Sequence, residues 1–358
     1  MIHDGFIYLA TLMLLAAILV NLPVYLRGKG AQTFFKFAPP IVLIYLGMML
    51  LCTMKVWDLQ DTSAIYVAIK NPLLYAMLFL MLLRCDLKKI IKLGPKMLIG
   101  FFSASISIGV GFVVSYGIFH KLLGPESWKA LAALCGSWLG GGSNMLAIQA
   151  ILDVSEESLA YSLVMDSVCA VLYVMFLLWV INFSKEFNSW TKADVRLIDE
   201  VGASLEKEAR EDKRPLTWKN MLLLIGVSFF ISSLSKDAGV MVASVLPVFD
   251  KATWTVLLVT ATGLIVAMTP FGKIKGTEEV SNIMLYIVIA MIASRADISA
   301  MGNAPVWLAA GFLILLIHIA VMVILAKLIR LDIFTCAVAS LANVGGTATA
   351  PVLAGAYS

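Results

Sequence analysis

The stretch LCGSWLGGGSNMLAIQ, from Leu134 to Gln149, places four glycines, two serines and an asparagine inside an apolar run long enough to cross a membrane. Glycine is a poor helix former. Lipid permits little backbone other than helix, because an unpaired N–H or C=O group there costs several kcal/mol. Non-helical backbone persists at that depth only where it is buried in protein or lines a wet cavity. The stretch therefore predicts an interrupted membrane helix that serves a binding site.

The composition is that of a polytopic membrane protein. The chain of 358 residues is 61% hydrophobic and 14% charged, whereas soluble domains are about 25% charged. Apolar runs recur from end to end, so we expect an all-α protein with about 11–12 spans in a lipid bilayer, the bacterial inner membrane. The net charge of +4 gives no indication of nucleic acid. The first run lacks a basic leader and a cleavage site, and we interpret it as the first membrane helix.

A polar loop over residues 185–217 divides the chain into two halves, 1–184 and 218–358. Both halves contain an asparagine, twelve mostly apolar residues and then Arg-x-Asp, in Asn71–Asp86 and in Asn282–Asp297. In each half a proline, a long apolar helix and a glycine-rich segment follow in the same order. This order predicts an internal duplication with spans 1–6 in the first repeat and one broken helix in each repeat, at about residues 128–152 and 333–357.

Paired broken helices indicate the binding site of a secondary transporter. A helix that stops in mid-membrane offers free N–H groups at one half-helix and free carbonyls at the other, which together hold an anion and a cation. The alternative is close helix packing through glycine. The predicted substrate-binding residues are Gly140, Gly141, Gly142, Ser143, Asn144, Asn343, Gly345, Gly346, Thr347 and Thr349.

Asp166 is the predicted coupling carboxylate. It lies nine residues after Glu157, about 13 Å along a helix and so near the middle of the bilayer, where a charge costs about 3 kcal/mol. Oxygen ligands from Asp166, Ser143 and Asn144 suit sodium, and Asp166 and Asn144 are the predicted metal ligands. A protonated structural carboxyl is the alternative.

Other polar residues in the apolar runs have a structural interpretation beside a functional one. Asn71 and Asn282 either reach the site or cap the helices that they begin, and Gln149 is a candidate pathway residue. Arg295 either pairs with Asp297 or neutralises a substrate carboxylate. A mid-membrane histidine, His318, is more often packed and hydrogen-bonded than a proton carrier.

Charge and span count predict the topology. Basic residues between 27 and 36 and between 84 and 96 place those loops in the cytoplasm and the N-terminus outside. An inverted repeat then requires the short apolar piece Ala238–Phe249 to form a span of its own. The second repeat stops within its broken segment, so we expect a further helix of about 20–25 residues after Ser358.

The paired segments GSWLGGGSNM and LANVGGTATAP resemble a family of bacterial and plastid membrane proteins known as domain of unknown function 819. More distantly, the chain resembles the fold group of bile-acid sodium symporters and sodium/proton antiporters. That resemblance implies two broken helices crossing in a mobile core domain, which moves against a scaffold domain like an elevator. The antiporters carry two adjacent polar residues on the helix after the first break, where this chain has Met165 and Asp166.

These observations predict a sodium-coupled secondary transporter of a small anionic organic solute, with no cofactor apart from the coupling sodium ion or proton. The alternative is a cation/proton antiporter in which Asp166 exchanges the two ions. The chain lacks HExxH, GxSxG and paired membrane aspartates, so we do not expect an enzyme. By analogy with elevator transporters, we expect a homodimer.

Overall fold

The computed structural model describes residues 1–26, 28, 34–35, 40–83, 94–180, 183–193, 216–296 and 302–344. These residues form helices and no strand, and six of the helices are long and apolar enough to cross a membrane. The prediction of an all-α integral membrane protein is confirmed. The six are α1 (Gly5–Tyr25), α4 (Ser63–Leu82), α6 (Gly94–Leu123), α9 (Glu156–Val180), α12 (Trp218–Val245) and α15 (Ala304–Ile329). The shorter apolar helices include α3 (Pro40–Thr53), α7 (Ser127–Gly140), α8 (Gly142–Leu152), α13 (Lys251–Ala267), α14 (Thr277–Ala293) and α16 (Ile333–Val344).

The chain forms two compact units, and each takes helices from both halves of the sequence. Unit 1 comprises Met1–Asp86, Leu146–Ser167 and Pro215–Gly302. It therefore combines α1, α3 and α4 with α12, α13 and α14. Unit 2 comprises Leu87–Met145, Val168–Arg214 and Asn303–Ser358, and it combines α6 and α7 with α15 and α16.

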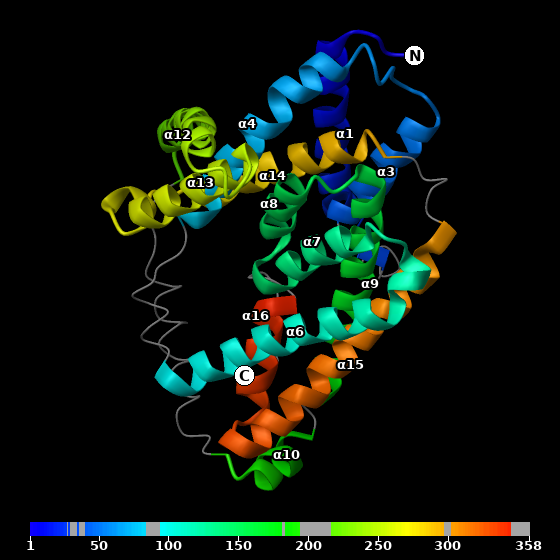
Figure 1. Cartoon of the computed structure of the whole chain (residues 1–358), viewed down its shortest axis with the longest axis vertical. Coiled ribbons are helices and arrows are strands. Elements are labelled where there is room, and N and C mark those ends of the chain that lie inside the picture. The colour runs from blue at the N-terminus through cyan, green and yellow to red at the C-terminus, as the bar shows by residue number, and fades with distance from the viewer. Residues whose placement is uncertain are drawn as a thin grey trace. The chain divides into compact units, whose positions relative to one another are not determined.

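Unit 1 is organised around α4 and α14. These two helices pack against each other, α4 also contacts α12 and α13, and α14 also contacts α1 and α3 (Figure 1). Consecutive apolar residues of α4, such as Met77 and Phe79, are fully buried because the helix has neighbours on several sides. The same holds for Ile292 on α14. A helix buried all round is apolar all round, which explains the long uninterrupted runs in the repeated segments.

The prediction that Ala238–Phe249 forms a separate span is wrong. Residues 218–245 form one helix, α12, without a break. Three serines of α12 are buried at helical spacing, together with Gly239, while Lys236 and Asp237 are exposed on another face. The Ser232 hydroxyl donates to the carbonyl of Pro72 on α4 at 2.8 Å. The polar residues are thus a packing stripe along α12, and they do not mark its end.

Unit 2 contains a close pair of long helices, α6 and α15 (Figure 1). A Cβ atom at Gly111 of α6 would lie 3.0 Å from the backbone oxygen of Ile314 on α15, so glycine permits the contact. The half-helix α16 packs against both α6 and α7. A short amphipathic helix, α10 (Ser184–Thr191), lies beside α15 and α16. It falls in the predicted polar loop, most of which lies outside the described residues.

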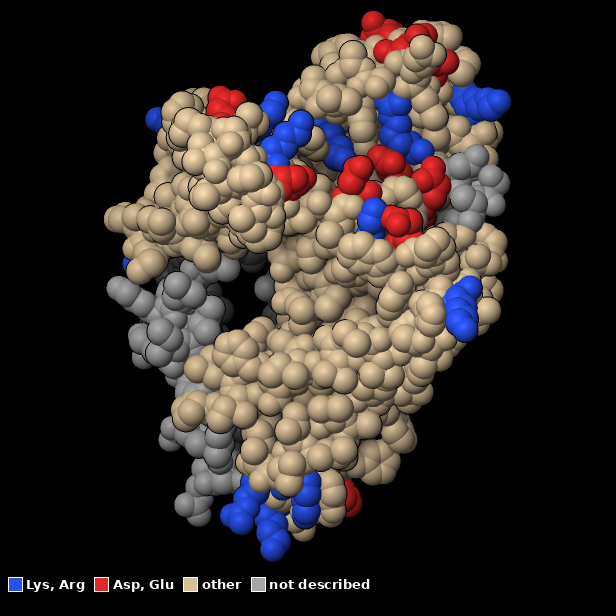
Figure 2. Space-filling view, in the orientation of Figure 1, with Lys and Arg blue, Asp and Glu red and all other residues tan. Residues whose placement is uncertain are grey.

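The surface of unit 2 suits a lipid environment. Large apolar side chains such as Phe102, Ile106 and Val113 of α6 and Leu316 and Ile324 of α15 are exposed. Figure 2 shows an uncharged surface over these helices and a group of lysines and arginines at the end where α10 lies. An apolar band that ends in cations is what bilayer hydrocarbon bounded by headgroups favours.

Candidate functional site

The first glycine segment interrupts its helix at a single residue. The helix α7 ends at Gly140, and α8 begins at Gly142. Between them Gly141 has φ 93° and ψ 174°, a combination that only glycine adopts readily. The Gly141 N–H still donates to the Ser137 carbonyl, at 2.6 Å. The strain is therefore confined to the one position where the chain changes direction.

Residues 140–144 present polar groups at this break. Gly140 and Asn144 are exposed, and residues 141–143 are partly exposed. A Cβ atom at Gly140 would collide with the Asn144 amide, only 2.0 Å away. The Asn144 N–H donates a hydrogen bond to the Gly141 carbonyl at 3.0 Å, and this bond closes the first turn of α8. A helix N-terminus with an exposed amide side chain can bind an anion or a polar ligand.

The helix α16 runs toward the second glycine segment and ends, as described, at Val344. The four predicted ligands Gly345, Gly346, Thr347 and Thr349 lie outside the described residues. Because α16 packs against α7 within unit 2, the helices that lead into the two glycine segments are neighbours.

Asn343 is fully buried, and its amide is already engaged. Its Oδ1 accepts a hydrogen bond from the Ser105 hydroxyl of α6 at 2.8 Å, and its Nδ2 donates to the Ala339 carbonyl at 2.8 Å. In this conformation Asn343 therefore fixes α16 against α6, and its side chain is fully buried.

A second buried polar cluster lies in unit 2, and the sequence analysis did not find it as a cluster. His318 on α15 is fully buried, with one ring nitrogen 2.6 Å from the Ser107 hydroxyl and the other 2.6 Å from the Ser340 hydroxyl. These serines belong to α6 and α16. The available signal was the run SASIS in an apolar helix, whose partners lie more than two hundred residues away in the sequence.

Gln149 on α8 and Asp166 on α9 belong to unit 1, whereas Asn144, at the start of α8, belongs to unit 2. Asp166 lies inside α9, partly buried and one residue before the point where this helix passes from unit 1 to unit 2. Gln149 on α8 is buried; its Nε2 donates to the Val154 carbonyl at 3.2 Å, and its Oε1 has no hydrogen-bond partner. A buried, unpaired amide oxygen is costly and suits a site that a ligand or water completes.

The interpretation of Asn71 and Asn282 as helix caps is wrong. The helix α4 begins at Ser63 and α14 begins at Thr277, so both asparagines lie inside their helices. Both are partly exposed. Their helices pack against each other in unit 1.

Arg295 lies at the end of α14 between two tyrosine rings. Its guanidinium carbon is 4.6 Å from the centre of the Tyr66 ring and 5.7 Å from that of Tyr8. It donates to the carbonyl of Leu59 and to the hydroxyl of Thr62, at 3.2 Å for the latter. The predicted partner Asp297 lies outside the described residues. The contacts that are described tie the loop before α4 to the end of α14.

The fold and this geometry define an integral membrane protein that contains a glycine-interrupted helix. The chain belongs to the family described as "Protein of unknown function (DUF819)", whose model matches residues 10–358. A relative named "Uncharacterized membrane protein YjcL", from Bacillus subtilis (strain 168), is 22% identical over 344 residues, which are 91% of this chain and 84% of the relative. The resemblance to family 819 is thereby confirmed.

Proposed function

We propose that this protein is a sodium-coupled secondary transporter of a small anionic organic solute. One observation carries the proposal: α7 and α16, from corresponding places in the two halves, pack together in unit 2, and each leads into a glycine-rich segment. In transporters, discontinuous helices from two repeats form the substrate and ion sites. The solute site comprises residues 140–144 together with the glycines and threonines after Asn343.

The composition of the two units supports an elevator mechanism in the fold group of bile-acid sodium symporters and sodium/proton antiporters. Each unit contains helices from both halves, as expected when a mobile core and a scaffold are each built from a duplicated element. In an inverted repeat α4 and α14 run in opposite directions across the membrane, so the chain between them must cross the membrane an even number of times. With α12 a single helix, that number is four. The crossings are α6, α9, α12 and α13 if the α7–α8 segment enters and leaves the membrane on the same side.

Asp166 is the proposed coupling carboxylate. A carboxylate in the middle of a membrane helix is expensive unless an ion, a proton or a polar partner compensates it. The alternative function is a cation/proton antiporter, in which Asp166 binds the cation and the proton in turn and no organic solute moves. Either function makes the protein a carrier in the bacterial inner membrane with no enzyme activity. A homodimer fits an elevator mechanism.

The experiment is thermal unfolding of the full chain in detergent, with sodium titrated against potassium at constant ionic strength and at two pH values. A ligand that binds only the folded state at 100 times its Kd stabilises it by about 2.7 kcal/mol. Sodium should raise the melting temperature of the wild type but not that of Asp166→Asn. The control Asp237→Asn removes an exposed acid of α12 and should keep the sodium effect.

The other outcomes separate the alternatives. A pH-dependent stability without a sodium effect, abolished by Asp166→Asn, would favour proton exchange. If neither sodium nor pH distinguishes Asp166→Asn from the wild type, Asp166 has no coupling role. Once sodium stabilises the protein, organic anions can be screened for additional stabilisation in its presence.

A further inference from the structure

His318 is the centre of a buried hydrogen-bond chain that crosses unit 2. Its Nδ1 is 2.6 Å from the hydroxyl oxygen of Ser107 on α6, and its Nε2 is 2.6 Å from that of Ser340 on α16. The ring of Tyr173 on α9 meets the imidazole edge to face, with 5.8 Å between the ring centres. His318 thus contacts three other helices of its unit although no part of it is exposed.

The hydroxyl of Ser107 determines which imidazole nitrogen carries the proton. Ser107 donates its one hydroxyl proton to the Ala104 carbonyl at 2.7 Å, so toward His318 it can act only as an acceptor. The proton of neutral His318 is therefore on Nδ1. Nε2 is left as the acceptor of the Ser340 hydroxyl, which makes Nε2 the basic atom of the chain.

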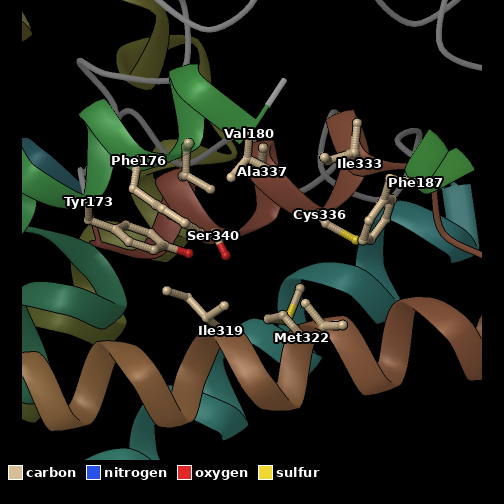
Figure 3. A pocket seen from close by; sticks show the side chains of 12 residues that line it. Tyr173, Phe176, Val180, Phe187, Ile319, Met322, Ile333, Cys336, Ala337 and Ser340 are labelled. Atoms are coloured by element: carbon tan, nitrogen blue, oxygen red, sulfur yellow. The ribbon is translucent and has the colours of Figure 1, made fainter. Parts of the chain in front are cut away.

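The Ser340 end of this hydrogen-bond chain borders a pocket. The pocket encloses about 480 Å³, including its open mouth, and α9, α10, α15 and α16 line it. Its walls are apolar, formed by residues such as Phe176, Phe187 and Met322. Figure 3 shows the hydroxyl groups of Tyr173 and Ser340 turned toward one another in this pocket, within hydrogen-bonding reach. The polar end of the pocket is therefore one hydroxyl away from Nε2.

We propose that His318 is a proton-binding site, loaded from this pocket through the hydroxyl groups of Tyr173 and Ser340. Ser340 passes its hydroxyl proton to Nε2 and takes one from Tyr173, which in turn takes one from a hydronium ion at the mouth of the pocket. The hydronium ion becomes water, His318 gains one proton and one positive charge, and both hydroxyls are restored. This inference goes beyond the proposed function, because it requires neither sodium nor an organic solute.

Protonation changes the connection between α15 and α16. In the cation both nitrogens donate, so Ser340 must accept from Nε2–H and turn its own proton away. Among the described residues, the other ionisable side chains nearby on the packed helices are Tyr173 on α9, Cys336 and Asp332 on α16, and Lys327 on α15. On α6 the facing group is Ser107. Because an unpaired buried cation is costly, protonation favours a conformation in which α16 shifts or water enters.

The test is nitrogen NMR of ¹⁵N-histidine in the full chain carrying His3→Gln and His120→Gln. Both of these histidines are exposed, and the chain has three in all, so His318 gives the only remaining side-chain signals. At about pH 8 we expect the neutral pattern with the proton on Nδ1, converting to the imidazolium pattern as the pH is lowered through the range in which the protein stays folded. Ser340→Ala should shift the midpoint of this conversion, and Tyr173→Phe should slow proton exchange.

The control Ser105→Ala removes a hydroxyl of α6 that bonds to Asn343 and does not contact His318, and it should leave the titration unchanged. A neutral imidazole throughout the pH range in which the protein stays folded would overturn the proposal. So would a proton on Nε2 in the neutral form, or a titration that Ser340→Ala leaves unaltered. None of these outcomes bears on sodium binding at Asp166, so this proposal and the proposed function can fail separately.

Discussion

The hydroxyl of Ser105 on α6 donates a hydrogen bond to Oδ1 of Asn343 on α16, at 2.8 Å across 238 positions of sequence. Asn343 lies one helical turn after Ser340, the partner of His318. The last two turns of α16 are therefore held to α6 and α15 by side-chain hydrogen bonds. This half-helix leads directly into the second glycine segment, so its position determines where that segment begins.

We predict an energetic coupling between Ser105 and Asn343. Hydrogen bonds between membrane helices contribute about 0.6 kcal/mol on average and at most about 1.7 kcal/mol. A double-mutant cycle of Ser105→Ala and Asn343→Ala, measured by reversible unfolding in detergent, should give a coupling energy in this range. The same cycle with Ser103→Ala, two residues away on α6, should give none. Equal coupling for both serines would show that Asn343 acts through general packing.

Gly141 and Gly142 should respond differently to alanine. Gly141 has φ 93° and ψ 174°, where a side chain costs about 1–3 kcal/mol. Gly142 starts α8 with negative φ, and a Cβ atom there meets nothing within 4 Å. Gly141→Ala should lower the melting temperature clearly, whereas Gly142→Ala should be neutral or stabilise by about 0.4–1 kcal/mol. Similar losses in both variants would mean that the chain does not turn at Gly141.

Arg295 should not be replaceable by lysine. Its guanidinium bonds to the carbonyl of Leu59 and to the hydroxyl of Thr62 while it lies over the Tyr66 ring. An ammonium group cannot keep this planar arrangement, so Arg295→Lys should destabilise the protein by about 1 kcal/mol in thermal unfolding, the usual value of a lost hydrogen bond. Arg330→Lys, at an exposed helix end, is the matched control and should have no effect. Equal melting temperatures would refute the structural role of Arg295.

The membrane helices and the first glycine break were predictable because lipid leaves few choices. Apolar length and composition predict a span, and a glycine run at mid-span predicts an interruption. The division of α12 failed for a related reason. Three of its serines and Gly239 are small residues buried along one face of the helix, and Lys236 and Asp237 lie on an exposed face. Sequence polarity alone does not distinguish a helix end from a close helix contact.

The buried polar network of unit 2 was not predictable in the same way. His318 and Asn343 could be singled out as polar residues in apolar runs. Their partners Ser107 and Ser105 are ordinary helix residues whose role depends on how α6 meets α15 and α16. Periodicity within one helix carries no information about which distant helix its face contacts. These pairs therefore required the tertiary structure.

Asp250 should make the stability of unit 1 depend on pH. It caps α13 by accepting hydrogen bonds from the backbone N–H and the hydroxyl of Thr253. The bond from the Thr253 side chain contributes most to lowering the pKa of Asp250 below its usual value. Because the folded pKa lies below the unfolded one, the stabilisation is fully present above the unfolded pKa and is lost as pH falls through the folded pKa.

Asp250→Ala should therefore cost about 1 kcal/mol at neutral pH, the usual value of an N-cap, and less as the pH is lowered. In Asp250→Asn the side chain keeps an acceptor oxygen but no longer ionises. The stability of this variant should therefore fall less steeply on acidification than that of the wild type. Thermal unfolding of the three proteins from neutral pH to about pH 3, below the usual pKa of aspartate, measures both effects. A gap between the wild type and Asp250→Ala that stays constant over this range would show that the Asp250 carboxylate does not contribute through its charge.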